Sequence, residues 1–319
     1  MRNYCFSIKL FSKYRTELMG GAIIGVMWGH LMNHTIQPYV FAQLARLLHT
    51  PAFLFLSGFG LYYSFSKNSS VTSFFRKRVV RLYIPFLIIA TPFFLILLLL
   101  GKCDLLQFLG YITTLAFWYE GNYYAMWYIA ISVLLYMIFP FLYHVLFNKY
   151  ESPFCFLAII ILCMLCIYAA IQHFSPSYWK IIETGVSKTY MFPIGCYCGY
   201  LSKKGVEIPL WKLAIFILVC FGLYIKGVNV AVMRSLIGLP ISCILLSVLF
   251  KNNSFELIRK VLAWFGRYSL EIYLLHVLIH FTFMDIVEID DKWSMSLGVI
   301  SAIVLCTPFS MMIKKVSPK

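Results

Sequence analysis

Ten apolar runs, most of them about as long as a bilayer is thick, are the feature that most constrains this sequence. They fall near residues 17–36, 44–65, 80–100, 123–147, 153–173, 188–202, 209–226, 230–250, 261–284 and 294–313. A helix needs roughly 20 apolar residues to cross the hydrocarbon core of a membrane. The runs therefore predict an all-α fold, in which residues 1–319 form one domain and a polytopic bundle of about ten transmembrane helices.

Composition supports this class of protein. Hydrophobic residues make up 61% of the chain and charged residues only 12%, whereas soluble domains carry roughly 25% charged residues. The basic segment at residues 1–15 lacks the apolar run and small-residue cleavage site of a secretory signal. We therefore expect it to be retained as an amphipathic cytoplasmic segment.

The net charge of +15 raises the question of a nucleic-acid partner, and the distribution of the charge answers it. Positive residues collect on the cytoplasmic side of membrane proteins. One set of alternate loops and ends carries 20 of the 27 cations: Arg2, Lys9, Lys13, Arg15, Lys67, Arg76, Lys77, Arg78, Arg81, Lys149, Lys203, Lys204, Lys212, Lys251, Arg259, Lys260, Arg267, Lys314, Lys315 and Lys319. The asymmetry predicts a multi-pass protein of the inner (cytoplasmic) membrane with both termini cytoplasmic, and no nucleic-acid partner.

Two regions fit the pattern of spans less well. The run at 188–202 is short and rich in glycine, and the amphipathic stretch from Asp104 to Trp118 is expected to lie as a helix at the outer interface. Cys103 is the only one of ten cysteines in a predicted outer loop, so no disulfide framework is expected. Cys196 and Cys198 lack the two-residue spacer of a typical metal or redox pair, and no metal site is indicated.

Two histidines in the first run, "GVMWGHLMNHT", are the first candidates for chemistry. His30 is expected roughly 20 Å along the helix from the cytoplasmic edge, and His34 lies one turn further on the same face. His30 either packs against another helix and hydrogen-bonds a carbonyl, or acts as a base. Ionisable residues at such depth are usually functional, which favours the second interpretation. For His34 the packing interpretation is preferred.

A basic cluster, "FFRKRVVRLYIP", precedes the third run. Arg78 and Arg81 are three residues apart and share a helix face, with Arg76 and Lys77 beside them. The cluster either contacts lipid headgroups or binds phosphate, since guanidinium groups grip phosphate oxygens bidentately. The residues alone leave both alternatives open.

Two further segments carry small or polar residues inside apolar helices. In "TPAFLFLSGFGLYYSF", Ser57, Gly58 and Gly60 are expected mainly to let helices approach closely. In "WFGRYSLEIYLLHVLIH", Glu271 and His276 lie on the ninth run. A buried carboxylate is costly unless paired, so we expect Glu271 to meet an arginine of the basic loop.

These segments, in this order, resemble the bacterial integral-membrane acyltransferase family called acyltransferase type three. The resemblance covers nearly the whole chain and rests on "ELMGGAIIGVMWGHL", "PAFLFLSGFGLYYSF", "RKRVVRLYIPFLI", "AMWYIAISVLLYMIFPFLY", "FPIGCYCGYL" and "LAWFGRYSLEIYLLH". It implies a bundle of about ten helices that transfers an acyl group, usually acetyl, from cytoplasmic acyl-coenzyme A to a sugar hydroxyl of a glycan or lipid-linked glycan.

The resemblance also implies roles for single residues. The family's first-helix histidine falls on His30, its Arg-x-x-Arg pair on Arg78 and Arg81, and its Ser-Gly motif on Ser57 and Gly58. The sequence departs from the family at one position: the family places an arginine eleven positions before the histidine, where this chain has Met19. The nearest arginine, Arg15, is expected to reach coenzyme phosphates at the inner surface.

The mechanism implied by this resemblance has His30 remove the hydroxyl proton as the oxygen attacks the thioester, with a transient acyl-histidine as the variant. Expected site residues are His30 as catalytic group; Arg15, Lys77, Arg78 and Arg81 for the coenzyme; and Ser57, Trp127, Glu271 and His276 as substrate or supporting groups. Trp127, Tyr128 and Ser57 are the alternatives for holding the oxyanion. Acetyl-coenzyme A is the expected co-substrate, and membrane lipids surround the protein. A transporter or flippase of a glycan or small metabolite is the alternative class, and a structural assembly factor a third. The acceptor, the acyl length and the oligomeric state are not determined by the sequence.

Overall fold

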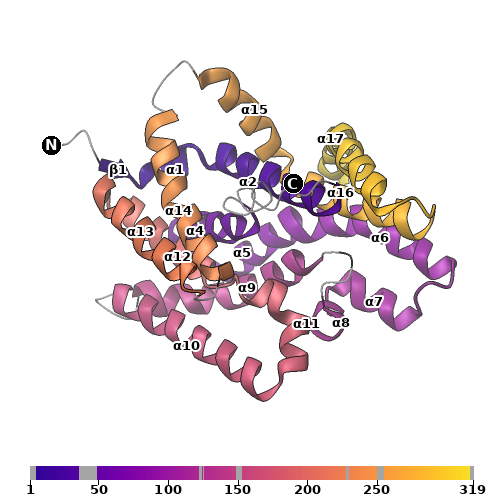
Figure 1. Ribbon diagram of the computed structural model, residues 1–319, viewed down its shortest axis with the longest axis horizontal. Coiled ribbons are helices and arrows are strands. Elements are labelled where there is room, and N and C mark those ends of the chain that lie inside the picture. Colours follow the sequence, from indigo (N-terminus) through magenta and orange to yellow (C-terminus); the bar gives the residue numbers. More distant parts are fainter. Residues whose placement is uncertain are drawn as a thin grey trace.

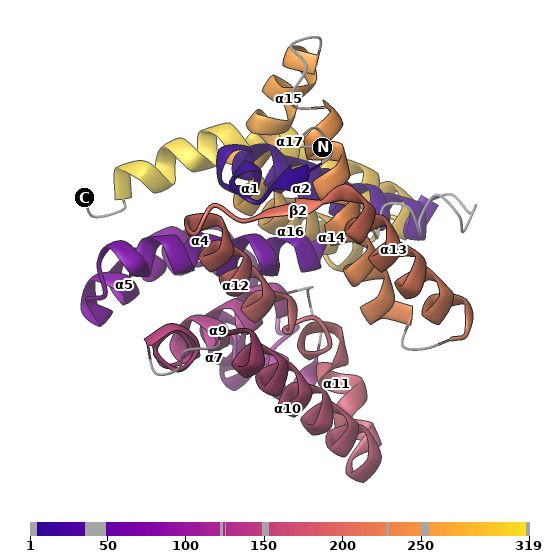
Figure 2. The same ribbon diagram turned by 90° about the vertical axis from the view of Figure 1, so that its left-hand side faces the viewer.

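The computed structural model of the chain describes residues 5–35, 49–121, 124, 126–148, 153–227, 230–249 and 255–316. These residues are almost entirely helical, and the helices pack into a bundle (Figure 1). The predicted all-α class is thereby confirmed. Seen from the side, α15 lies at one end of the bundle and α10 and α11 at the other (Figure 2).

The elements follow one another along the chain with short connections. They are β1 (Cys5–Ser7), α1 (Lys9–Lys13), α2 (Arg15–Thr35), α4 (Thr50–Lys67), α5 (Val71–Arg78), the π-helix η2 (Val79–Tyr83), α6 (Ile84–Leu99), α7 (Leu105–Thr113), α8 (Phe117–Glu120), α9 (Trp127–Tyr143), the π-helix η4 (His144–Asn148), α10 (Pro153–Phe174), α11 (Pro176–Val186), α12 (Met191–Lys203), β2 (Glu207–Pro209), α13 (Leu210–Ile225), α14 (Val230–Leu249), α15 (Glu256–Arg267), α16 (Ser269–Asp285) and α17 (Asp291–Val316).

Several of these helices are suited to a bilayer. Within the described residues, four helical stretches are long and apolar enough to cross a membrane by length and composition: Val71–Leu99, Trp127–Phe147, Pro153–Phe174 and Asp291–Val316. Leu210–Ile225 and Ser235–Leu246 are shorter apolar helices. These helices are those of a membrane protein, whereas ten crossings and cytoplasmic termini stay predictions.

The prediction that the ninth apolar run, residues 261–284, forms a single helix was wrong. The chain turns at Tyr268 and divides residues 261–284 between α15 and α16. The reason is visible in the composition of α15, whose strongly amphipathic sequence carries Lys260 and Arg267 on exposed positions and Arg259 on a half-buried one. A helix with one charged face favours the edge of a membrane over its centre.

The stretch from Asp104 to Trp118 forms two short helices, α7 and α8, in place of one. A capping box starts α7, because the Asp104 carboxylate accepts from the Gln107 backbone N–H and the Gln107 side chain accepts from the Asp104 N–H. Thr114 ends it in a left-handed conformation, with φ of 65°. The short run at 188–202 is helical, as α12. Helix α11 lies between the predicted runs.

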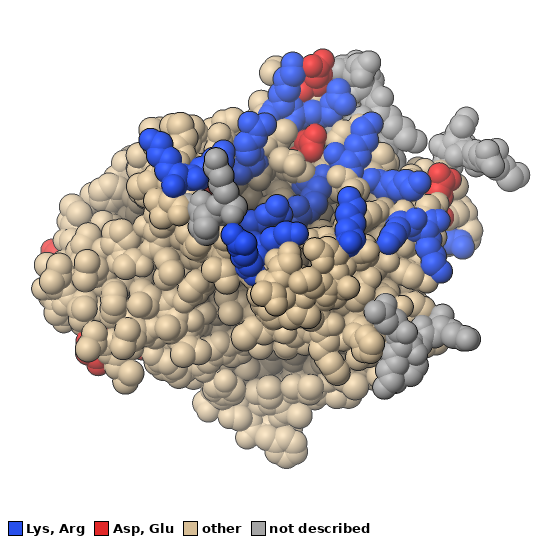
Figure 3. Space-filling view, turned by 180° about the vertical axis from the view of Figure 1, so that it is seen from behind, with Lys and Arg blue, Asp and Glu red and all other residues tan. Residues whose placement is uncertain are grey.

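A two-stranded antiparallel ribbon joins the start of the chain to the connection after α12. Cys5 pairs with Pro209, and Ser7 pairs with Glu207. The sequence predicts that both segments lie on the cytoplasmic side. Figure 3 shows Lys and Arg gathered on one part of the surface, with the remainder of that face almost free of charge. This gathering of Lys and Arg agrees with the asymmetry of charge in the sequence, whereas the side of the membrane that it faces stays a prediction.

Glycines let two pairs of helices touch backbone to backbone. Between α4 and α12, a Cβ on Gly58 would lie 2.2 Å from the Phe192 carbonyl oxygen, and one on Gly195 would lie 2.0 Å from that of Phe55. The packing interpretation of Gly58 is therefore confirmed. Helices without side chains at the contact approach more closely than other helices do.

The second pair, α2 and α15, uses glycines in the same reciprocal way. A Cβ on Gly20 would lie 1.9 Å from the Leu262 carbonyl oxygen, and one on Gly266 would lie 1.7 Å from that of Thr16. Thr16 directly follows Arg15, so this contact fixes the start of α2 and with it the backbone of Arg15.

Two hydrophobic clusters form the interior. One is built mainly on α2, α6, α16 and α17, and the other mainly on α1, α4, α9 and α12. Met19, Tyr128 and Tyr136 pack against both clusters. These three side chains therefore mark the boundary between the two halves of the core, where polar groups can gather without interrupting either half.

The α2–α15 contact generates a first prediction. Gly266→Ala should lower the free energy of unfolding by roughly 1–3 kcal/mol, because the new methyl group meets a backbone carbonyl that cannot turn aside. Thermal unfolding in detergent measures the change. Gly21→Ala is the matched control, since a Cβ there meets nothing within 4 Å. Equal stability of the two variants would show that this helix contact is looser than described.

Candidate active site

A cavity of about 240 Å³ lies at the boundary between the two halves of the core. Its walls come from α2, α4, α5, η2, α9 and the start of α16. They are formed by Arg15, Met19, Thr50, Phe53, Gly60, Ser64, Arg78, Arg81, Leu82, Tyr128, Tyr136, Ser269, Leu270 and Tyr273. Three arginines thus share one space with three tyrosines and three small hydroxyl side chains.

The two arginines of the Arg-x-x-Arg pair reach this cavity from a π turn. Arg78 ends α5, and Arg81 lies within η2. Pro85 follows Arg81 by four residues at the start of α6. Because proline has no N–H and its ring clashes with the carbonyl four residues earlier, the backbone widens there. The proline in "RLYIP" therefore accounts for the local geometry that presents the pair.

Arg15 enters the same cavity from the first residue of α2. Its Nε donates to the Leu56 carbonyl oxygen at 3.2 Å. The guanidinium lies flat against Gly60, where a Cβ would come within 2.9 Å of a terminal nitrogen. Gly60 thus makes room for an arginine, while its neighbour Gly58 makes room for a helix.

Arg78 lies over two aromatic rings. Its guanidinium carbon is 5.6 Å from the centre of the Phe74 ring and 5.9 Å from that of Tyr136. The Tyr136 hydroxyl in turn is 2.9 Å from Ser57 Oγ. The Nε of Arg78 is buried and, among the described groups, has no hydrogen-bond partner. A buried guanidinium N–H without an acceptor is costly, so the site is suited to receive one.

The charge of the cavity is uniformly positive. No aspartate or glutamate is among its lining residues, and the three arginines repel one another. Arg81 is exposed at the mouth, whereas Arg15 and Arg78 are half-buried. Guanidinium groups around a partly buried space form a site for an anion with several phosphate oxygens.

His30 lies deeper in the bundle, beside a second histidine. The ring centres of His30 and His276 are 5.3 Å apart, with ring planes at 77°. His276 is fully buried on α16, and its Nδ1 is 2.8 Å from the Ile272 carbonyl oxygen. Tyr273 lines the cavity and lies 6.0 Å from the His276 ring, centre to centre. Ring contacts therefore lead from the arginine cavity through Tyr273 and His276 to His30, which is itself outside the cavity lining.

The other expected site residues lie as follows. Ser57 is buried and touches the site through Tyr136. Lys77 is exposed and outside the cavity lining. Trp127 is buried beneath Lys188, whose Nζ is 4.5 Å from the ring centre, and is also outside the lining. The side chain of His34 lies outside the described residues.

The expectation for Glu271 was wrong. This carboxylate is buried on α16, accepts a hydrogen bond from Ser310 and interacts with Lys314. Among the described residues it meets no arginine. The reason is the turn at Tyr268, which lets α16 pack along α17. Glu271 therefore belongs to the contact between these two helices.

Sequence reasoning missed Tyr136. The signal was present, because Tyr128, Ser132 and Tyr136 recur every four residues in the otherwise apolar α9. Such spacing places three hydroxyl groups on one helix face, and polar groups inside a membrane helix usually face the protein interior. Two of the three line the cavity.

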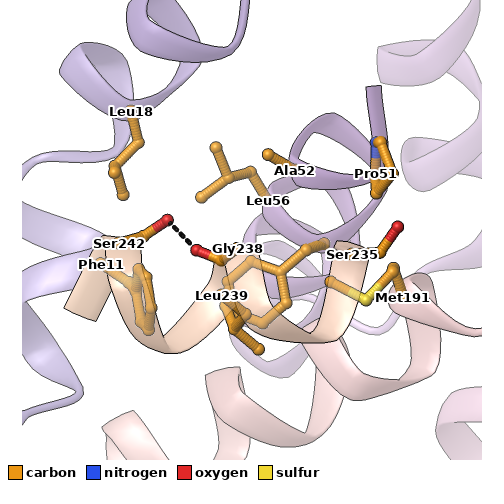
Figure 4. Close-up of a pocket in the computed structure, with 11 residues that line it drawn as sticks. Phe11, Leu18, Pro51, Ala52, Leu56, Met191, Ser235, Gly238, Leu239 and Ser242 are labelled. Atoms are coloured by element: carbon orange, nitrogen blue, oxygen red, sulfur yellow. Dashed lines mark hydrogen bonds between the residues drawn. The ribbon is translucent and has the colours of Figure 1, made fainter. Parts of the chain in front are cut away.

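Two other features lack the chemistry of an active site. A smaller apolar cavity of about 30 Å³ lies among α1, α2, α4, α12 and α14, where Ser242 Oγ donates to the Gly238 carbonyl oxygen (Figure 4). No charged side chain lines it. Cys103 is a free, buried thiol, and burial raises its pKa above the usual value, which disfavours a nucleophilic thiolate.

The fold is that of a membrane protein, and it places an arginine-lined cavity at the boundary between the two halves of the core, with His276 and His30 beyond it. A family model described as an acyltransferase domain matches residues 20–315. The chain belongs to this family, acyltransferase type three. Comparison with curated proteins and with solved structures gives no match.

The arginine cavity generates a second prediction. Pyrophosphate should raise the thermal unfolding temperature of the detergent-solubilised protein, because a ligand that binds the folded state stabilises it. Arg78→Gln should weaken this binding roughly tenfold or more, through loss of a charge-assisted contact. Lys67→Gln, an exposed cation at the end of α4, is the control. Equal stabilisation of both variants would mean that the anion binds elsewhere.

Proposed function

We propose that the protein is a membrane O-acyltransferase that moves an acyl group, most simply acetyl, from cytoplasmic acyl-coenzyme A to a sugar hydroxyl of a surface glycan or lipid-linked glycan. Membership of an acyltransferase family supports the reaction class. The observation that carries the finer proposal is the cavity lined by Arg15, Arg78 and Arg81. Arg15 and His30 lie on the same helix, α2.

The coenzyme end of acyl-coenzyme A is suited to the arginine cavity. It carries several phosphate groups, and arginine binds phosphate oxygens in pairs. The pantetheine arm is about as long as half the hydrocarbon core, roughly 15 Å. Along α2, Met19 in the cavity wall and His30 are eleven residues apart, or roughly 16 Å. A coenzyme held by its phosphates at the arginines would therefore bring its thioester to the depth of His30.

The reaction converts the thioester of acyl-coenzyme A and a free sugar hydroxyl into an oxygen ester and the coenzyme thiol. His30 accepts the proton of the sugar hydroxyl while that oxygen attacks the thioester carbonyl carbon. The tetrahedral oxyanion collapses, the carbon–sulfur bond breaks, and the coenzyme thiolate takes the proton from His30. Transfer through an acyl-histidine is the second route, with the same balance in two steps.

The tyrosines offer hydrogen bonds to the oxyanion. Tyr128 and Tyr273 are in ring contact, 5.4 Å between centres, and both line the cavity on the side that leads to His276. Their hydroxyl groups are donors of the type that stabilises tetrahedral intermediates. Tyr273 lies between the cavity and His276, so passage of the thioester requires its side chain to turn. The acceptor sugar enters from the opposite, outer end of the bundle.

His30→Ala supplies the third prediction. The variant should insert and fold as wild type does but lose transfer of acetyl groups by roughly 100-fold or more, because no base remains at the hydroxyl. Radiolabelled acetyl-coenzyme A and membrane extracts measure this. His173→Ala, which changes an exposed histidine on α10, is the control. Undiminished transfer by His30→Ala would remove this residue from the mechanism.

A deletion strain supplies the fourth prediction and separates an enzyme from a carrier. Mass spectrometry of surface glycans should show full-length glycan without its O-acetyl esters when the gene is deleted. A transporter or flippase predicts glycan that is missing from the surface or retained inside the cell. That second result would contradict the acyltransferase proposal for glycans.

A further inference from the structure

His276 is a buried histidine for which the chemistry proposed above has no use. It is fully buried at the centre of α16, three residues after Tyr273, and its ring contacts that of His30. Titratable side chains are rarely buried at this depth without a function. The question is what its two ring nitrogens do.

The hydrogen bond of Nδ1 determines the tautomer. Its partner is the Ile272 carbonyl oxygen at 2.8 Å, and a carbonyl oxygen only accepts. In the neutral ring the proton therefore sits on Nδ1, which donates to Ile272. The other nitrogen, Nε2, then carries a lone pair and can act only as an acceptor.

That acceptor is buried and has no hydrogen-bond partner among the described side chains and backbone groups. An unmet buried acceptor costs free energy that folding normally avoids. The neighbouring ring is His30, and imidazole rings at this separation can bring one nitrogen of each within hydrogen-bond distance when a ring turns. His280, one turn further along α16, differs: its Nδ1 is 2.8 Å from Ser294 Oγ, and its Nε2 is 3.5 Å from an Asp291 carboxylate oxygen.

Close packing holds His276 in place. A Cβ on Gly298 of α17 would lie 2.5 Å from the His276 carbonyl oxygen. The backbone hydrogen bond to Ile272 and the ring of Tyr273 fix the side chain from its own helix. The lone pair of Nε2 therefore has a set position beside the ring of His30, which is half-buried.

We propose that His276 is the positioning residue of the catalytic base: its Nε2 accepts the N–H of His30 and leaves the other His30 nitrogen unprotonated toward the sugar hydroxyl. This inference rests on the proposed function. The hydroxyl proton moves to the free nitrogen of His30, while the N–H shared with His276 stays on His30. No proton passes to His276, whose second nitrogen remains bonded to the Ile272 carbonyl.

In a soluble catalytic triad, a carboxylate occupies the position that His276 would have here. A third group that orients the base is the usual arrangement in acyl transfer. A carboxylate buried among apolar side chains would carry an unpaired charge when His30 is neutral. A neutral imidazole with its proton held by a backbone carbonyl supplies the acceptor without that charge.

Two variants of His276 test the inference. His276→Phe keeps a buried ring but removes the lone pair, so kcat for acetyl transfer should fall roughly 100-fold. The KM for acetyl-coenzyme A should stay within about twofold, because His276 lies outside the lining of the arginine cavity. His276→Gln, whose amide oxygen can accept the same hydrogen bond, should recover at least tenfold of the loss. If the phenylalanine variant does not accumulate, the kcat of His276→Gln relative to wild type still tests the role of the acceptor.

His280→Gln is the matched control, a buried histidine on the same helix with partners on α17. Its kcat should stay within about threefold of wild type when normalised to folded protein. Normal kcat in His276→Phe, or no difference between the phenylalanine and glutamine variants, would overturn the positioning role. A wild-type protein without acetyl transfer would instead overturn the proposed function, so the two failures are distinguishable.

Discussion

Mutual repulsion among Arg15, Arg78 and Arg81 is the interaction on which the rest of this site depends. Like charges that share a partly buried space, without a carboxylate in its wall, are stable only when the fold holds them there. The Leu56 carbonyl and the glycine surface at Gly60 hold Arg15. The rings of Phe74 and Tyr136 hold Arg78. The cavity therefore holds three positive charges with no acidic side chain among its lining residues, and it is suited to bind an anion.

A single helix connects the two ends of the proposed chemistry. α2 begins at Arg15 and carries His30 fifteen residues later, roughly 22 Å along its axis. Glycine contacts with α15 fix its first turn, and its far half lies against α16 and α17. The distance between the anion site and the histidine is therefore set by the rise of a helix, which changes little with side-chain motion.

Much of this could be predicted from the sequence, for physical reasons that differ between residues. Apolar run length identifies membrane helices because the bilayer sets one thickness, and the Ser57–Gly58 motif predicts close packing because only small residues permit it. The basic cluster that brings Arg78 and Arg81 to the cavity was also visible in the sequence. The break at Tyr268 was not, since an apolar run continues through it and hides the change from an amphipathic to a buried helix.

The contacts between distant elements were beyond the sequence as well. Nothing in "YSLEIYLLH" distinguishes Glu271, which meets Ser310 and Lys314, from His276, which meets His30. Both are polar residues in one apolar helix, and only the packing of α16 against α2 and α17 separates their surroundings. Tyr136 shows the opposite case. Tyr128, Ser132 and Tyr136 follow one another at four-residue intervals, a pattern that was visible in the sequence but matched no motif.

The central claim is that one bound molecule spans from the three arginines to His30. A structure of the protein with a non-hydrolysable acetyl-coenzyme A analogue tests it most directly. The account predicts phosphate oxygens in contact with Arg15, Arg78 and Arg81, the pantetheine arm passing a rotated Tyr273, and the acyl carbonyl beside the His30 ring. An analogue whose acyl end stays in the arginine cavity, or points to the cytoplasm with His30 untouched, would contradict the account.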